Sequence, residues 1–245
     1  MLQLGGFSPK CISEIIIANY NLSLSFNDDN IKNDSLMSLR DCKDFLNQGD
    51  KTSGLKTIYP WRDYSHLSEV VYCDQTTDGG GWTVIQRRVF SDKREDFYRS
   101  WVEYQFGFGN KSSEFWLGND LISELTSHGL HQLRIDLEDF ENNKRWAKYA
   151  YFHVGDKSTN FKLSAGRYSG DAGDGLGEKS IPKSHNGYSF TTYDNDNDSL
   201  PEGNCAVRYA CYISLFFIFS YFEISKIKKE NMIIYTPYIN NRDII

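Results

Sequence analysis

Three carboxylates and two amides alternate over residues 194–198, which read Asp-Asn-Asp-Asn-Asp. Such a run of side-chain oxygens repels itself unless a cation neutralises it, and oxygen ligands alone favour Ca²⁺ over softer metals. The pattern is not that of an EF-hand loop, because Ser199 stands at the expected glycine and Cys205 at the expected closing glutamate. A solvated acidic turn is the alternative, since Asp and Asn both favour turns. The spacing alone leaves both interpretations open.

The bulk composition narrows the class of protein and of partner. The chain of 245 residues is 40% hydrophobic and 24% charged, an ordinary balance for a soluble globular protein. It contains 16 Tyr, 16 Phe, 5 Trp and 19 Gly, which favours short strands, many turns and a core filled by aromatic rings. A net charge of -6 argues against a nucleic-acid partner, because binding phosphate needs a basic face. The apolar run at 212–222 is too short for a membrane span, which needs about 20 residues.

Five cysteines stand at positions 11, 42, 73, 205 and 211, and none forms a CxxC pair. This spacing argues against zinc-ribbon and thioredoxin-type sites. Cys42 and Cys73 flank a segment of turns and a strand, as a disulfide that closes a loop of medium length would. Such a bridge stabilises a fold by roughly 3–4 kcal/mol. The odd count leaves one thiol unpaired or without its expected partner.

The histidines and the sequence ends give weaker signals. The five histidines, at 66, 128, 131, 153 and 185, form no nucleophile or metal motif, so we expect no enzyme. Four N-glycosylation sequons begin at Asn21, Asn33, Asn110 and Asn197, and they matter only in a secreted protein. The beginning of the chain shows no evident signal peptide, because its apolar run at 15–18 is short and follows Glu14.

Periodicity predicts an α+β fold, an antiparallel sheet flanked by helices. Residues 1–38 are predicted to be a poorly ordered lead-in, and from residue 166 a loop-rich binding lobe ends in the acidic run. We predict helices at 42–46, at 96–104 and through 121–125, and strands at 58–60, 69–72, 82–88, 132–137, 148–154 and 161–163.

A series of motifs over residues 39–209 resembles the fibrinogen C-terminal domain, and most closely the tachylectin-5 and ficolin-type lectins. The matching segments are DC at 41–42, VYCD at 71–74, GGGWTVIQRR at 79–88, FYRSW at 97–101, GFG at 107–109, EFWLGN at 114–119, LRIDL at 133–137, YSGDAGD at 168–174 and NCA at 204–206.

The resemblance implies a secreted, non-enzymatic recognition module that contains two disulfides and binds Ca²⁺. The family's metal ligands match the side chains of Asp196 and Asp198 and the backbone carbonyl of Leu200. A further carbonyl is that of Glu202 or Gly203, with Gly203 as the candidate. The implied ligand is an N-acetylated carbohydrate recognised in innate defence. A protein receptor or matrix partner, as for fibrinogen- and angiopoietin-like modules, is the alternative. Homo-oligomers occur in the family.

The resemblance ends at Tyr209. The family continues with a Gly-rich, double-Trp stretch and a Cys-His pair, whereas residues 210–245 read as a tail foreign to the family. We therefore predict an incomplete domain in which the sheet lacks its closing strand and has an exposed edge. The residues of the family's acetyl pocket have no counterparts here, so none is assigned, and sugar binding is expected to be impaired.

Overall fold

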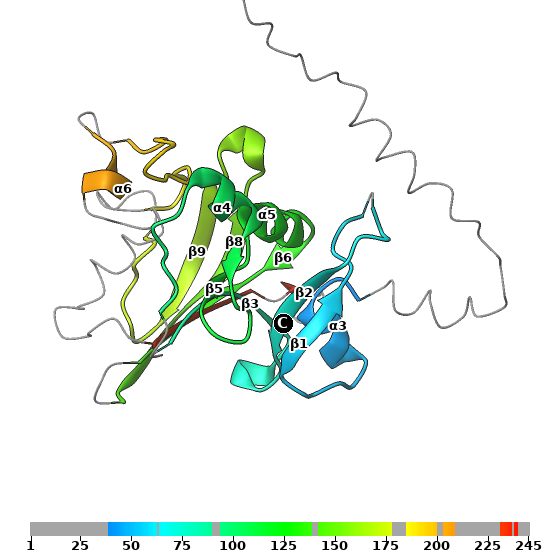
Figure 1. Cartoon of the computed structure of the whole chain (residues 1–245). Coiled ribbons are helices and arrows are strands. Elements are labelled where there is room, and N and C mark those ends of the chain that lie inside the picture. The colour runs from blue at the N-terminus through cyan, green and yellow to red at the C-terminus, as the bar shows by residue number, and fades with distance from the viewer. Residues whose placement is uncertain are drawn as a thin grey trace, which may run out of the picture. The chain divides into compact units, whose positions relative to one another are not determined.

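The computed structural model describes residues 39–62, 64–89, 94–138, 142–177, 185–199 and 203–208, and the backbone of 231–236 and 238–239. These residues form antiparallel strands with a few short helices, the α+β class that the sequence predicts (Figure 1). Several features named above lie outside the described residues: the lead-in at 1–38 with Cys11 and the sequons at Asn21 and Asn33, then Leu200, Glu202, Tyr209, Cys211 and the apolar run at 212–222. None of the helices described is long and apolar enough to cross a bilayer.

The helices are α3 (Cys42–Asn47), α4 (Trp101–Phe106), α5 (Asn119–Ser127) and α6 (Cys205–Arg208), with 3-10 turns η1 (Thr77–Gly79) and η2 (Lys157–Thr159). The strands are β1 (Gly54–Ile58), β2 (Glu69–Asp74), β3 (Trp82–Arg88), β4 (Phe108–Gly109), β5 (Phe115–Trp116), β6 (Leu130–His131), β7 (Leu133–Glu138), β8 (Lys144–Val154), β9 (Leu163–Gly170), β10 (Asn231–Thr236) and β11 (Tyr238–Ile239).

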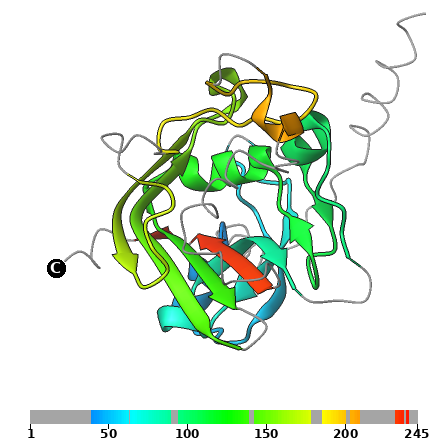
Figure 2. The same ribbon diagram turned by 90° about the vertical axis from the view of Figure 1, so that its left-hand side faces the viewer.

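The main sheet has the strand order β1-β2-β3-β10-β7-β8-β9, and β10 pairs antiparallel with both of its neighbours. Figure 2 shows β10 (red) crossing the centre of the sheet. The predicted exposed edge is therefore wrong. The segment Asn231–Thr236, which we assigned to a tail foreign to the family, fills the gap between β3 and β7. Backbone pairing along both sides of a central strand leaves no open edge at that place.

A cluster of aromatic rings fills the core beneath α4. The ring of Phe190 lies 5.9 Å from Trp101, 5.3 Å from Tyr104 and 6.1 Å from Trp116, measured between centroids. All four side chains are buried. Phe190 lies four residues before the acidic segment, so this packing fixes the chain leading into the segment to the core.

Several predicted boundaries are wrong. Strand β1 ends at Ile58 instead of covering 58–60, β8 begins at Lys144 rather than at 148, and β9 begins rather than ends at Leu163.

Two further differences have a clear local reason. Helix α4 begins at Trp101 rather than at residue 96, because Ser100 and Glu103 form a capping box that starts the helix there. The residues Gly166–Gly170, predicted to be irregular, instead continue β9, and their backbone pairs with Ala147–Tyr151 of β8. The pairing of β9 with a long neighbouring strand overrides its glycine-rich composition.

A disulfide between Cys42 and Cys73 joins α3 to β2, with the two Cα atoms 5.3 Å apart. Hydrogen bonds from nearby polar groups add to this link. The Gln75 amide donates to the Cys42 carbonyl at 2.9 Å and accepts from the Gly81 N–H at 2.8 Å. Gly81 has φ 80, and a Cβ atom there would lie 2.6 Å from Lys43, so this turn requires glycine.

Asp41 caps α3, and its carboxylate accepts from the N–H groups of Lys43 at 2.7 Å and Asp44 at 3.1 Å. Burial and the neighbouring negative charge of Asp44 nevertheless raise the pKa of Asp41 to about 7.

This pKa predicts a pH-dependent stability. Between about pH 4 and 7 the folded chain binds a proton that the unfolded chain releases, so Asp41 makes the free energy of unfolding fall as pH rises. The difference between the ordinary pKa of 3.8 and the folded-state pKa of about 7 corresponds to a fall in unfolding free energy of about 4 kcal/mol, at 1.36 kcal/mol per pKa unit. Asp41→Asn keeps the acceptor oxygen and cannot ionise, so urea unfolding across this range should show a smaller fall. Asp50→Asn is the control, because its ion pair with Lys56 lowers the pKa of Asp50. Identical wild-type and Asp41→Asn profiles would contradict the assignment.

Candidate functional site

The acidic segment leaves the core as a short closed loop. Thr191 and Thr192 are buried, whereas Asp196 is exposed and Asp198 is half-buried. Thr192 and Asn195 close a tight turn by exchanging backbone hydrogen bonds of 3.0 and 3.3 Å. The loop therefore begins inside the molecule and presents Asp194 and Asp196 at the surface, with Asp198 partly covered.

Two amide side chains, those of Asn197 and Asn204, hold the loop through hydrogen bonds. The Asn197 amide donates to the Phe190 carbonyl at 3.0 Å, and the Asn197 backbone N–H donates to the Thr191 hydroxyl at 3.0 Å. Asn204 donates to the Thr192 carbonyl at 2.8 Å, and its own amide oxygen accepts from the Ala206 N–H at 2.7 Å. Asn204 thereby connects the loop to the first turn of α6.

Asp194 braces the loop against α4. One of its carboxylate oxygens accepts from the Trp101 N–H at 2.9 Å and from the Thr192 hydroxyl at 2.7 Å. Trp101 is the first residue of α4, where backbone N–H groups lack partners within the helix. The carboxylate of Asp194 thus has a structural role, because it holds the loop against the start of α4.

Asp196 and Asp198 lie on the outer part of the same loop. The Asp198 N–H donates to Asp196 Oδ1 at 3.2 Å, and Asp198 Oδ2 accepts from the N–H of buried Cys205 at 2.7 Å. Among the ion pairs of the described residues, none joins Asp194 or Asp196 to a Lys or Arg side chain. The negative charge of Asp196 therefore has no basic partner within the part of the chain that the structure describes.

The donor set suits a hard cation in chemical type. Two carboxylates and nearby backbone carbonyls are the oxygen ligands that Ca²⁺ prefers. No group of three or more His, Cys, Asp or Glu side chains converges on a metal position within the described ranges. A cation at Asp196 and Asp198 would therefore depend on carbonyl oxygens, such as that of Gly203, which lies in the exposed turn before α6.

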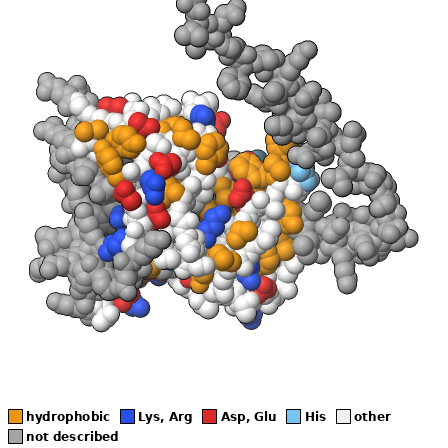
Figure 3. Space-filling view, viewed as in Figure 1, with side chains coloured by type: hydrophobic (Ala, Val, Ile, Leu, Met, Phe, Trp, Pro, Cys, Tyr) orange, Lys and Arg blue, Asp and Glu red, His pale blue; other side chains and the backbone are white. Residues whose placement is uncertain are grey.

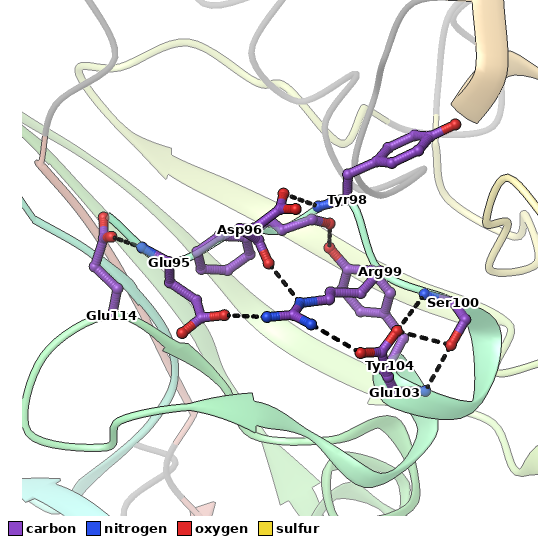
Figure 4. Close-up of polar contacts among 9 residues, drawn as sticks. Glu95, Asp96, Tyr98, Arg99, Ser100, Glu103, Tyr104 and Glu114 are labelled. Atoms are coloured by element: carbon purple, nitrogen blue, oxygen red, sulfur yellow. Dashed lines mark hydrogen bonds and ion pairs between the residues drawn. The ribbon is translucent and has the colours of Figure 1, made fainter. Parts of the chain in front are cut away.

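A charged network stabilises the helix that Asp194 contacts (Figure 4). The Arg99 guanidinium lies between two carboxylates, 2.8 Å from Glu95 and 2.9 Å from Glu103. The hydrogen bond that Arg99 donates to the Glu95 carboxylate raises the pKa of Arg99, and hydrogen bonds from the Ser100 N–H and hydroxyl lower the pKa of Glu103. Buried Glu114 accepts from the Glu95 N–H at 2.7 Å and so fixes the start of this segment.

Aromatic stacking makes a second contact between the α4 region and the loop. The rings of Tyr98 and Tyr193 stack with centroids 4.7 Å apart and an interplanar angle of 23°. Neither this stacked pair nor the contact between Asp194 and Trp101 was predicted from the sequence. The Ser-x-x-Glu pattern of a capping box can be recognised in a local stretch of sequence. The hydrogen bond between Trp101 and Asp194 cannot, because the two residues are 93 positions apart.

A profile of the family described as "Fibrinogen beta and gamma chains, C-terminal globular domain" matches residues 38–217. The chain belongs to this family. Fibrinogen-like protein 1 of Bos taurus is 48% identical over 174 residues, which are 68% of this chain and 54% of that protein. This chain thus spans about half the length of that relative.

Solved structures of the family have the same fold. The fibrinogen-like globe domain of human ANGPTL6 aligns with a TM-score of 0.68 at 28% identity, covering 82% of this chain and 96% of that one. A lamprey fibrin D-dimer complexed with the peptide Gly-His-Arg-Pro-amide aligns with a TM-score of 0.61 at 33% identity. That alignment covers 81% of this chain and 64% of the lamprey chain.

The brace formed by Asp194 predicts a measurable loss of stability. Asp194→Ala removes the acceptor of the Trp101 N–H and should lower the free energy of unfolding by about 1–2 kcal/mol in urea. Asp194→Asn keeps an acceptor oxygen and should lose less. Ser199→Ala, which changes an exposed hydroxyl of the same loop, should match the wild type. Equal losses for Asp194→Ala and Ser199→Ala would show that the brace carries no stability.

Proposed function

We propose that this domain is a secreted, calcium-binding, lectin-like recognition module that binds rather than transforms its ligand. The observation that carries the proposal is the loop in which Asp196 and Asp198 share a hydrogen bond while neighbouring amides and Asp194 hold the backbone. Carboxylates held on a fixed loop bind a cation without first having to be ordered. In this proposal Ca²⁺ is held by Asp196, Asp198 and the carbonyls of Leu200 and Gly203.

The proposed ligand class is an N-acetylated carbohydrate, met in innate defence. Its support is the series of sequence motifs that resembles those of the tachylectin-5 and ficolin-type lectins. The sequence after Tyr209 differs from the family's sugar-pocket residues, so we propose that sugar affinity is reduced in this chain.

A protein partner is the second candidate. Its support comes from the similarity to the ANGPTL6 globe domain and to a lamprey fibrin structure that contains a bound peptide. In this alternative the domain recognises a receptor or matrix protein.

The calcium site predicts a cation-dependent gain in stability. A ligand that binds only the folded state raises the free energy of unfolding by about 2.7 kcal/mol when its concentration is 100 times its Kd. Addition of CaCl₂ should therefore raise the unfolding free energy of the wild type. Asp196→Ala and Asp198→Ala should abolish this gain, and calorimetric titration should show no Ca²⁺ binding. Asp156→Ala is the matched control, because Asp156 is an exposed acid in another turn, bonded to Ser158 and Thr159. A gain of unchanged size in both loop variants would contradict the site.

The ligand class is tested on an N-acetylglucosamine resin, with Ca²⁺ and with EDTA. We expect weak retention of the full chain that EDTA abolishes, and less retention on a resin bearing unacetylated glucosamine. Complete absence of retention in Ca²⁺ would contradict sugar binding by this chain and favour the protein partner. Retention that EDTA leaves unchanged would contradict a calcium-dependent lectin.

A further inference from the structure

A sequon at Asn110-Lys111-Ser112 occupies the tip of the β4–β5 hairpin. The Asn110 N–H donates to the Glu114 carbonyl at 2.9 Å, and the Ser113 N–H donates to the Asn110 carbonyl at 2.7 Å. These bonds fix a tight turn in which Asn110 and Ser112 are exposed. The acceptor residues of the sequon are therefore presented on a rigid surface turn.

The side chain of Asn110 is oriented for modification at its nitrogen. Its Oδ1 accepts from the Ser112 N–H at 2.9 Å, an Asx turn within the sequon itself. The Nδ2 donates to no group within the described residues, so the atom that would carry a sugar is open to solvent. In the described part of the chain the other sequon begins at Asn197. There Nδ2 donates to the Phe190 carbonyl, and the side chain is half-buried.

A groove of about 480 Å³ begins beside Asn110, since its chain neighbours Gly109 and Lys111 both line it. The face seen in Figure 3 exposes several hydrophobic patches. The aromatic lining of the groove includes Trp61, Phe106 and Phe108, and the Phe106 side chain is 70% exposed.

Polar side chains lie along the same groove. Lys111 lies 4.0 Å from Glu69, and the Gln105 amide donates to Asp120 at 2.8 Å. Aromatic walls beside amide and carboxylate groups match a sugar ring, which has an apolar C–H face and an edge of hydroxyls.

We infer that Asn110 carries an N-linked glycan whose first sugars lie along this groove. The inference rests on the secretion part of the proposed function, because the modifying enzyme works in the secretory pathway. Asn110 Nδ2 attacks the anomeric carbon of an oligosaccharide carried on a polyprenyl diphosphate. The N–C bond forms, the C–O bond to the diphosphate breaks, the lipid diphosphate leaves, and an enzyme carboxylate takes the amide proton.

The groove explains why a glycan at this position would be retained against the protein. The exposed ring of Phe106 and the neighbouring aromatic side chains form an apolar surface, and covering it removes apolar area from water. A glycan on Asn110 begins at the rim of this surface and so covers it without a second molecule. A glycan on Asn197 would instead have to start from a half-buried nitrogen that donates to the Phe190 carbonyl and holds the acidic loop.

The test is the intact mass of the full chain, fused to a secretory leader and secreted from cultured eukaryotic cells. All variants carry Asn21→Gln and Asn33→Gln, so that only the sequons at Asn110 and Asn197 remain. We expect one glycan, on the peptide that contains Asn110, removed by peptide N-glycosidase with conversion of that residue to Asp. Asn110→Gln and Ser112→Ala should each lose it, and the control Ser112→Thr should keep it. An unmodified Asn110 peptide, or a glycan on Asn197, would overturn the assignment.

The position of the sugars is tested by hydroxyl-radical footprinting. Oxidation of Trp61 and Phe106 should be several-fold slower in the glycosylated chain than after enzymatic removal of the glycan. Equal oxidation would overturn the groove assignment. Calcium titration of the same samples separates the two proposals. A secreted, unglycosylated chain that binds Ca²⁺ overturns only the glycan, and a glycosylated chain that does not bind Ca²⁺ overturns only the calcium site.

Discussion

The backbone pairing of β10 with β3 on one side and β7 on the other joins the two halves of the sheet. On one side β3 leads to β2 and the disulfide between Cys42 and Cys73. On the other side β7 leads through β8 to β9, which precedes the acidic loop in the chain. Without β10, the N–H and C=O groups of β3 and β7 that face each other would lack partners. The last part of the sequence thus completes an arrangement built mostly from residues before 171.

Elements with strong local patterns were predictable from the sequence. Strand β3 matches its predicted bounds, and β7 alternates between buried and half-buried residues as its sequence pattern indicates. Strand β10 was not predictable, because a six-residue strand carries no information on which distant strands it will join. Its register depends on pairing with residues about a hundred positions earlier in the chain, which no local periodicity encodes.

The same distinction holds for the candidate site: features with a local sequence pattern could be predicted, and features that depend on distant contacts could not. Alternation of Asp and Asn left a cation loop and a solvated acidic turn both open, and the cation loop is a proposal. The role of Asp194 could not be predicted, because its carboxylate bonds to a helix start 93 positions away. Composition alone cannot separate the bracing carboxylate from the outer pair, since all three acids have the same spacing in sequence. Tertiary contact distinguishes them.

Hydrogen bonds of three side chains hold the described part of the acidic loop. Asn197 fixes its middle to Phe190, Asn204 ties it to α6, and Asp194 anchors it to α4. For the described residues up to Ser199, the entropy of ordering the loop is therefore largely lost during folding, before any ligand arrives. A cation that binds Asp196 and Asp198 then has mainly to replace its own hydration and to offset the repulsion between two carboxylates. Conversely, loss of the Asp194 brace would weaken cation binding without removing a metal ligand, because the loop would have to be ordered again on binding.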